Sequence, residues 1–224
     1  KWSFVINPSF YFLYNVTPRA TIRLQGAFAN KIGDLADFIT APIQTSLNYQ
    51  SYSLGILSEN RSVTLNAIYD LKYPLEMFFL NFGIGYTHQH NNLLSAQNVS
   101  QTLIKECPVL SPNGTDNINT YFNITKQVKA INTKFSLYGI YMHSKSLMMQ
   151  NSMIYSYSWN SLNVAPSVSF KPVSFMELYY TYSFSKNFTK VQNVSKSFLS
   201  QTHDINLVLQ PVKNLQFKAM ADIS

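Results

Sequence analysis

Apolar and polar side chains alternate strictly in two adjacent stretches of the chain, 161–170 and 176–185. Successive side chains of a β-strand point to opposite faces, so a period of two predicts strands. The segment 171–174, which contains Pro172, joins the two stretches as a short turn and makes them an antiparallel hairpin. One face of this hairpin is apolar and aromatic, with Leu162, Val164, Pro166, Val168, Phe170, Met176, Leu178, Tyr180, Tyr182 and Phe184. The other face carries mainly hydroxyls and amides.

Two kinds of protein have strands with such unequal faces. In a soluble sandwich the apolar face is the core, and the outer face usually carries many Lys and Glu. In a transmembrane barrel the apolar face meets lipid, and a small polar face meets a wet lumen. Only 12% of the residues are charged, against an average of about 25% for soluble domains, and 15% are aromatic. This composition favours the barrel, while the soluble all-β binding domain stays as an alternative.

The same alternation predicts about ten strands along the chain. We expect them at 2–16, 20–29, 60–71, 78–89, 118–125, 134–146, 161–170, 176–185, 199–210 and 215–223. Short turns recur near Pro18, Pro74, Lys129, Pro172 and Pro211. Longer polar loops are expected at 30–59, 90–117 and 187–197, with a short connection at 147–155. Short turns on one side and long loops on the other are typical of outer-membrane barrels.

Individual residues on the polar face agree with a wet interior. Arg23 lies on the polar face of its strand, which is tolerated only where that face meets water. Gly83 and Gly85 also fall on the polar face, where they indicate a bend or close packing by a neighbour. The fold class predicted is therefore an all-β, antiparallel transmembrane β-barrel, with residues 1–224 forming one barrel segment of a larger barrel.

Three segments resemble the barrel of TonB-dependent receptors of the Bacteroides type. They are 59–94, 161–186 and 211–224, and the resemblance lies in strand spacing, Pro/Lys turns and polar loops. It implies nutrient uptake across the outer membrane of a Gram-negative bacterium, by a 22-stranded barrel with an N-terminal plug that contacts TonB. It also implies a surface lipoprotein as a partner of the loops. No plug domain is visible in these residues, and a small complete barrel acting as a pore or structural protein remains an alternative.

Few residues stand out as a site. The ligand-binding candidates are Tyr49 and Tyr52 in the first long loop, with His88 and His90 at the end of a strand. The two histidines lack a third metal ligand nearby in sequence, so we expect no metal. A rim protease would use Asp34 and Asp37 with these histidines, but the spacing matches no motif. We therefore expect no catalytic residues, no enzyme activity and no cofactor.

The charge of the chain also bears on partners. The formal net charge is +7, yet the 17 Lys and Arg are scattered singly, so no nucleic-acid site is expected. Membrane lipid is the expected partner of the apolar face. The single cysteine, Cys107, excludes an internal disulfide.

Overall fold

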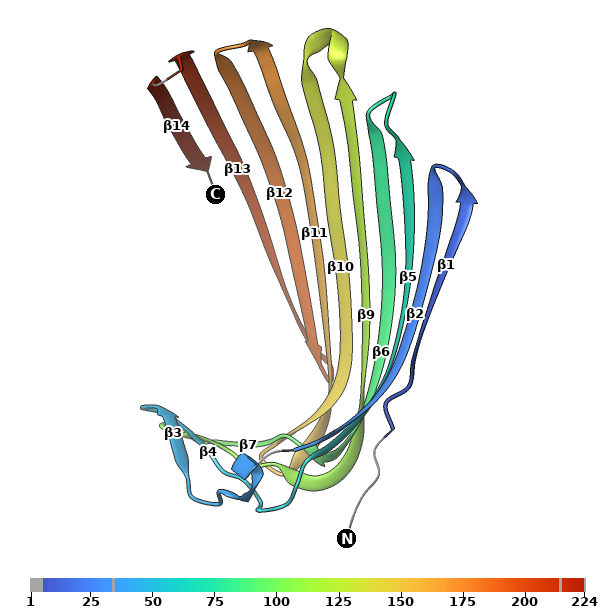
Figure 1. The fold of residues 1–224 in the computed structure, drawn as a ribbon. Helices are drawn as coiled ribbons and strands as arrows, with labels where there is room; N and C mark the ends of the chain where they lie inside the picture. The colour runs from blue at the N-terminus through green and yellow to red at the C-terminus, as the bar shows by residue number, and fades with distance from the viewer. Residues whose placement is uncertain (1–5, 34, 214, 224) are drawn as a thin grey trace.

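The computed structural model describes residues 6–33, 35–213 and 215–223. Ten strands follow one another in an antiparallel sheet, which forms a single curved and open layer (Figure 1). Strands β1 and β14 lie at its two edges. The ten strands are β1 (Ser9–Thr17), β2 (Ala20–Ile32), β5 (Glu59–Tyr73), β6 (Phe78–Leu94), β9 (Val109–Val128), β10 (Thr133–Gln150), β11 (Met153–Val173), β12 (Met176–Val191), β13 (Val194–Val212) and β14 (Leu215–Ile223).

Four short strands from the two long connections form a second, smaller part of the sheet, here named the loop sheet. They are β3 (Ile43–Ser46), β4 (Tyr49–Ser51), β7 (Ala96–Val99) and β8 (Ile104–Glu106), paired in the order β3-β4-β8-β7. Strand β7 also pairs with the end of β10. Figure 1 shows this part at the end opposite the short turns. The two 3-10 helices of the described residues are η1 (Leu35–Phe38) and η2 (Lys129–Ile131).

The ten-strand prediction is confirmed, but several predicted boundaries were wrong. The predicted loop 90–117 is shorter, because β6 continues to Leu94 and β9 begins at Val109. The connection at 147–155 and the loop at 187–197 are tight turns at 151–152 and 192–193. Residues 87–92 of β6 and 113–117 of β9 are polar on both faces, so they carry no alternation that the sequence could show. The adjoining ends of β10 and β11 instead carry apolar or aromatic residues on the concave face, including Met148, Tyr155, Tyr157 and Trp159. Of the first predicted strand, residues 1–5 lie outside the described residues, and β1 begins at Ser9.

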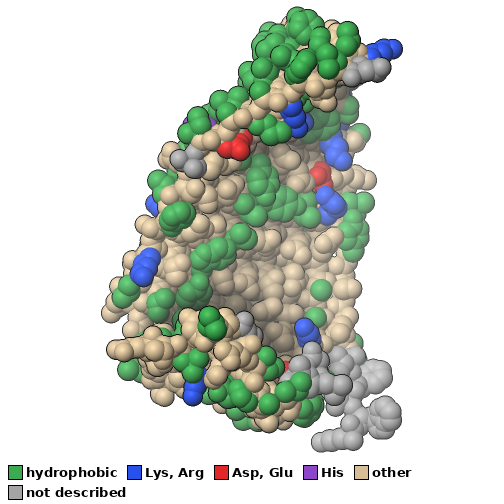
Figure 2. Space-filling model, turned by 90° about the vertical axis from the view of Figure 1, so that its left-hand side faces the viewer, with side chains coloured by type: hydrophobic (Ala, Val, Ile, Leu, Met, Phe, Trp, Pro, Cys, Tyr) green, Lys and Arg blue, Asp and Glu red, His purple; other side chains and the backbone are tan. Residues whose placement is uncertain are grey.

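The curvature of the sheet separates the two faces of the strands. Apolar residues on β6 such as Phe82 and Ile84 are exposed, whereas the residues between them are less exposed or buried. A curved layer spreads side chains on its convex side and crowds them on its concave side, so the apolar face is convex. Figure 2 shows the concave face as a hollow in which uncharged polar side chains and backbone alternate with hydrophobic patches and a few charged side chains.

The described residues have almost no conventional core. Their buried apolar side chains are Ala20 and Leu94, while many large apolar side chains lie exposed on the single layer. Removing such a side chain from water is worth roughly 1.5–3 kcal/mol. The convex face therefore needs an apolar environment outside the sheet. In the described part of the chain, no helix is long and apolar enough to cross a membrane.

Candidate functional site

The convex face carries a band of uncharged residues. On β9, between β6 and β10, this band comprises four alternate residues, 118–124, and is bounded by Asp116 and Lys126. On each of β6, β10, β11 and β12 the band comprises five alternate residues, and the next residue on that face is His88, His143, Asn160 or Lys186, respectively. The bands span 78–86, 133–141, 162–170 and 176–184. The eight steps of about 3.4 Å from the first to the ninth residue of a band extend about 27 Å along a strand.

The band follows the tilt of the strands rather than the rows of paired residues. Phe78, the first residue of β6, is linked through successive pairs to Tyr180, which lies four residues after the start of β12 at Met176. These strands are four steps apart, so the stagger is one residue per strand. With a strand spacing of about 4.8 Å, this stagger corresponds to a tilt of about 35°.

The polar end of the band shifts by the same amount. His88 is linked in register to Lys190 on β12, whereas the band on β12 ends four residues earlier, before Lys186. The two borders of the band are therefore parallel and lie about 22 Å apart at this tilt, before the side chains are added. A lipid-facing band in a barrel is about 25 Å tall. In a soluble sheet, nothing requires the border of the apolar face to stay level across tilted strands. The level borders and the height of this band therefore match those of a lipid-facing band.

Tyrosine and histidine side chains mark the border on the loop side. Tyr86 donates a hydrogen bond to Asp116 Oδ1 at 2.7 Å, and His88 Nδ1 lies 2.8 Å from the same atom. Two strands further on, Tyr141 donates to Asn160 Oδ1 at 3.0 Å, and His143 Nδ1 lies 2.7 Å from it. Each tyrosine is the last residue of its band and directs its hydroxyl to the polar side. Such aromatic side chains are typical of a membrane interface.

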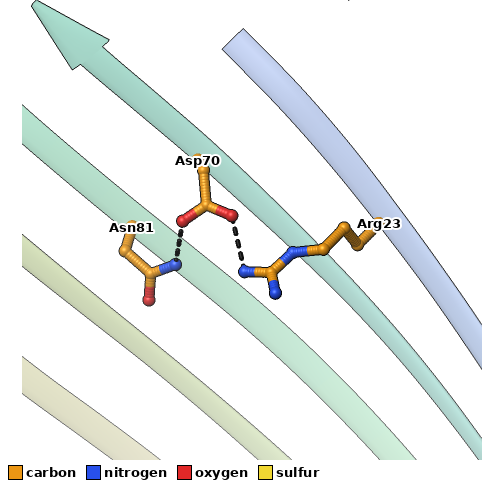
Figure 3. Close-up of polar contacts among 3 residues, drawn as sticks. All are labelled: Arg23, Asp70 and Asn81. Atoms are coloured by element: carbon orange, nitrogen blue, oxygen red, sulfur yellow. Dashed lines mark hydrogen bonds and ion pairs between the residues drawn. The ribbon is translucent and has the colours of Figure 1, made fainter. Parts of the chain in front are cut away.

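The concave face carries an ion pair that joins three strands (Figure 3). Arg23 on β2 donates from Nη2 to Asp70 Oδ2 on β5 at 2.6 Å, and Asn81 Nδ2 on β6 donates to Asp70 Oδ1 at 2.7 Å. The side chain of Asp70 is 14% exposed, so its charge needs both partners. This network cross-links the strands on the polar side and provides a fixed charged pair facing the interior.

Amide side chains extend the polar surface toward the loops. Asn60 Nδ2 donates to Asn91 Oδ1 at 2.7 Å, and Asn91 Nδ2 donates to Asn113 Oδ1 at 3.4 Å, across β5, β6 and β9. Nearer the short turns, the Tyr121 ring covers Gly83, where a Cβ atom would lie 2.4 Å from the ring. The expected close packing at this glycine is thus confirmed.

A groove of about 540 Å³ lies on the same face over β12 to β14. Its lining includes two carboxylates, one ammonium and several amide and hydroxyl groups, with Glu177, Tyr179, Thr181, Asp204, Asn206, Val208, Gln216 and Lys218. Ser169 Oγ donates to Glu177 Oε1 at 3.1 Å. The concave face can therefore hydrogen-bond a polar solute or a polar protein surface.

The long loop between β2 and β5 is closed at its base. The backbone N–H and the hydroxyl of Ser58 both donate to Asp37 Oδ2, at 2.9 and 2.8 Å, and Gly33 N donates to Ser58 O at 2.6 Å. These hydrogen bonds, together with the charge of Lys31, hold the pKa of Asp37 below its ordinary value. The loop therefore leaves the sheet as a defined unit and reaches the second long loop through β4 and β8.

Among solved structures, a point mutant of the ferric enterobactin receptor PfeA from Pseudomonas aeruginosa is similar to this chain. The TM-score is 0.63 at 11% sequence identity, and the match covers 96% of this chain. The fold is that of an open β-barrel segment. The match covers 36% of the receptor chain, so this chain spans about a third of its length. No family model and no curated protein matches the sequence.

The structure places the four ligand-binding candidates in two groups. Tyr49 and Tyr52 are half-buried in and beside the loop sheet, where Tyr52 N donates to Glu106 O at 2.8 Å. His88 and His90 lie on the convex face of β6, as the pairs of these residues show. In the described ranges, no three His, Cys, Asp or Glu side chains stand close enough together to hold a metal ion.

Some residues that define the site were not identified from the sequence. Asp70 and Asn81 were missed as partners of Arg23, and Asp116 was missed as the partner of His88. Each partner lies on a neighbouring strand, so its position depends on strand register. Asp37, a candidate for the protease interpretation, closes the loop instead, while Asp34 lies outside the described residues.

Proposed function

We propose that this chain is part of an outer-membrane β-barrel receptor that takes up a nutrient with energy supplied through TonB. The placement in a membrane is supported by the apolar band, whose two borders stay level across the sheet although the strands are tilted. The polar concave face then lines the barrel interior, and the two long loops contact the solute or a surface lipoprotein. The proposal assigns no catalytic role to any residue.

Two observations support a receptor rather than a simple pore. The fold similarity is to a ferric enterobactin receptor, and the sequence resembles receptors of the Bacteroides type. In addition, β1 and β14 each pair on one side only within the described residues. A barrel that these ten strands closed alone would pair those two edges. We infer that further strands complete the wall, and that the plug contacting TonB belongs to the same polypeptide.

The mass of the native polypeptide in an outer-membrane fraction tests this proposal. An antibody against residues 30–59 would detect the polypeptide after membrane fractionation. We expect a band several times heavier than the 25.6 kDa of this chain, located with outer-membrane markers. Such a mass is required by a 22-stranded barrel with a plug. A band near 25.6 kDa in the membrane would favour the small pore, and a soluble product would rule out the membrane assignment.

Energy coupling is tested separately. Cells that express the full-length protein should accumulate its nutrient, and deletion of TonB should reduce uptake to background while leaving the protein in the outer membrane. Uptake that is unchanged without TonB would remove this part of the proposal and leave the barrel itself intact.

A further inference from the structure

Three lysines gather on the convex face on the loop side of the apolar band. Lys145 on β10 pairs with Ser158 on β11, and Ser158 pairs with Lys190 on β12. The two lysines therefore stand on either side of β11, two strand spacings or about 10 Å apart. Lys186 lies on the same face of β12, four residues closer to the short turns, as the first residue beyond the band. We name these three residues the lysine patch.

The strand between the lysines carries small polar side chains on this face. They are Ser156, Ser158 and Asn160, so β11 carries no bulky group between Lys145 and Lys190. On β12, Phe188 lies on this face between Lys186 and Lys190 and adds one apolar side chain to the patch. Hydroxyl and ammonium groups can both donate hydrogen bonds to phosphate oxygens. The patch therefore offers a shallow, donor-rich surface the size of an anionic headgroup.

Two of the three lysines, Lys186 and Lys190, have no acidic residue on the neighbouring strands of this face. Among the residues that the structure describes, none of the three lysines has a carboxylate within 4.0 Å. The nearest acid by strand register is Asp116 on β9, opposite Lys145. Asp116 interacts with the charge of Lys145 and also with Tyr86 and His88, so it limits the patch on that side. On β11 and β12 this face carries no acidic residue.

The position of the patch restricts its occupant to an amphiphile. Toward the short turns, Tyr141, Leu162 and Phe184 end the apolar band on the same three strands. An occupant would rest its hydrocarbon on these residues and its negative charge on the lysines. We propose that the lysine patch binds the phosphorylated headgroup of a lipid in the membrane leaflet on the loop side. This inference rests on the membrane placement given under Proposed function.

The test compares lipid retention by the full-length protein and by two triple variants. Lys145→Gln, Lys186→Gln and Lys190→Gln together remove the patch. Lys134→Gln, Lys196→Gln and Lys218→Gln together remove the same charge from the concave face and are the matched control. Each protein is inserted into phosphatidylcholine vesicles that contain a minor fraction of lipid A, gently extracted, and analysed by native mass spectrometry for bound lipid A.

We expect the parent and the control to retain lipid A. The patch variant should retain less by a factor of at least about ten. The three corresponding Lys→Arg substitutions keep the charge and should restore retention, which separates lost binding from misfolding. Equal retention by parent and patch variant, or an equal loss in the control, would overturn the site. Displacement of lipid A by millimolar inorganic phosphate would overturn the lipid assignment in favour of a free phosphate.

Membrane insertion is measured in the same samples by resistance to carbonate extraction. If all the proteins insert and the patch variant retains lipid A like the parent, the lipid site fails and the barrel proposal stands. If the parent itself does not insert, both this inference and the proposed function fail.

Discussion

The ion pair between Arg23 and Asp70 shows how single residues hold the polar face together. Replacing Asp70 by Asn leaves the guanidinium without its counter-charge in a half-exposed position, and we expect a loss of about 1–2 kcal/mol in unfolding free energy. Urea unfolding in lipid vesicles, followed by tryptophan fluorescence, would measure this loss of unfolding free energy. The double variant Asp70→Asn with Arg23→Gln should regain part of the loss.

The exposed pair between Arg61 and Glu59 provides the matched control. Its atoms lie 3.8 Å apart and both side chains are more than half exposed, so Arg61→Gln should change stability little. Equal effects of Asp70→Asn and Arg61→Gln would show that the interior pair contributes no more than a surface contact.

Asp37 gives the base of the first long loop a defined pH dependence. Its hydrogen bonds from Ser58 and the nearby charge of Lys31 lower its pKa, so the contribution of the ionised form is complete above the unfolded pKa of about 3.9. This contribution is lost as the pH falls through the lower folded pKa. We expect amide hydrogen exchange in 33–58, corrected for intrinsic rates, to accelerate near pH 3 relative to pH 6. In the variant Asp37→Asn, the corrected exchange should be fast at both pH values. Equal protection of the wild-type segment at pH 3 and pH 6 would contradict the role of ionised Asp37 in closing the loop.

At the scale of one strand, adjacent residues of β10 should respond in opposite ways to the same charge. Leu137 lies in the middle of the band 133–141 on the convex face, whereas Ser136 faces the polar interior. Leu137→Arg should cost about 2–4 kcal/mol, because it places the charge near the bilayer midplane. Ser136→Arg should cost less than about 1 kcal/mol, since the interior is wet. Unfolding in vesicles measures both, and equal costs would argue against a lipid-facing band.

The loop sheet is the element that sequence analysis could least predict. Gln50 on β4 pairs with Lys105 on β8, although they belong to different loops. Paired residues of neighbouring strands lie close enough for a disulfide. In a Cys107→Ser background, the double variant Gln50→Cys with Lys105→Cys should oxidise readily, as a gel mobility shift would show. The pair Leu75→Cys with Lys105→Cys is the control, because Leu75 lies exposed in the short turn between β5 and β6, at the opposite end of the sheet, and equal oxidation of both pairs would contradict the loop sheet.

At the scale of the whole molecule, the sheet has two free edges and an uncovered apolar face. Strands β1 and β14 therefore present unpaired backbone groups among the described residues, which favours pairing with other chains. We expect residues 1–224 produced alone in detergent to form β-structure by circular dichroism but to remain heterogeneous and protease-sensitive. The full-length polypeptide should resist the same protease, and a monodisperse, resistant 1–224 would indicate that these strands can close by themselves.

The sequence by itself determined the class of fold, because apolar and polar residues alternate with a period of two in the parts of the strands that form the apolar band. Phe78 to Tyr86 shows this clearly, and both the predicted strand and its apolar face are confirmed. The predicted loops failed where β6 and β9 extend past the band, since polar residues on both faces of a strand look like loop residues in sequence. The extension of β11 does alternate, but Tyr155, Tyr157 and Trp159 lie on the concave face, so the apolar face of the band does not continue.

The tertiary structure alone decided which residues meet. Asp70 with Arg23, Asp116 with His88, and Lys145 beside Lys190 are each brought together by strand register. In the sequence, the lysines are scattered singly. Only strand pairing shows that Lys145 and Lys190 stand on either side of β11, on the loop side of the apolar band, because residues far apart in the sequence become neighbours across the sheet.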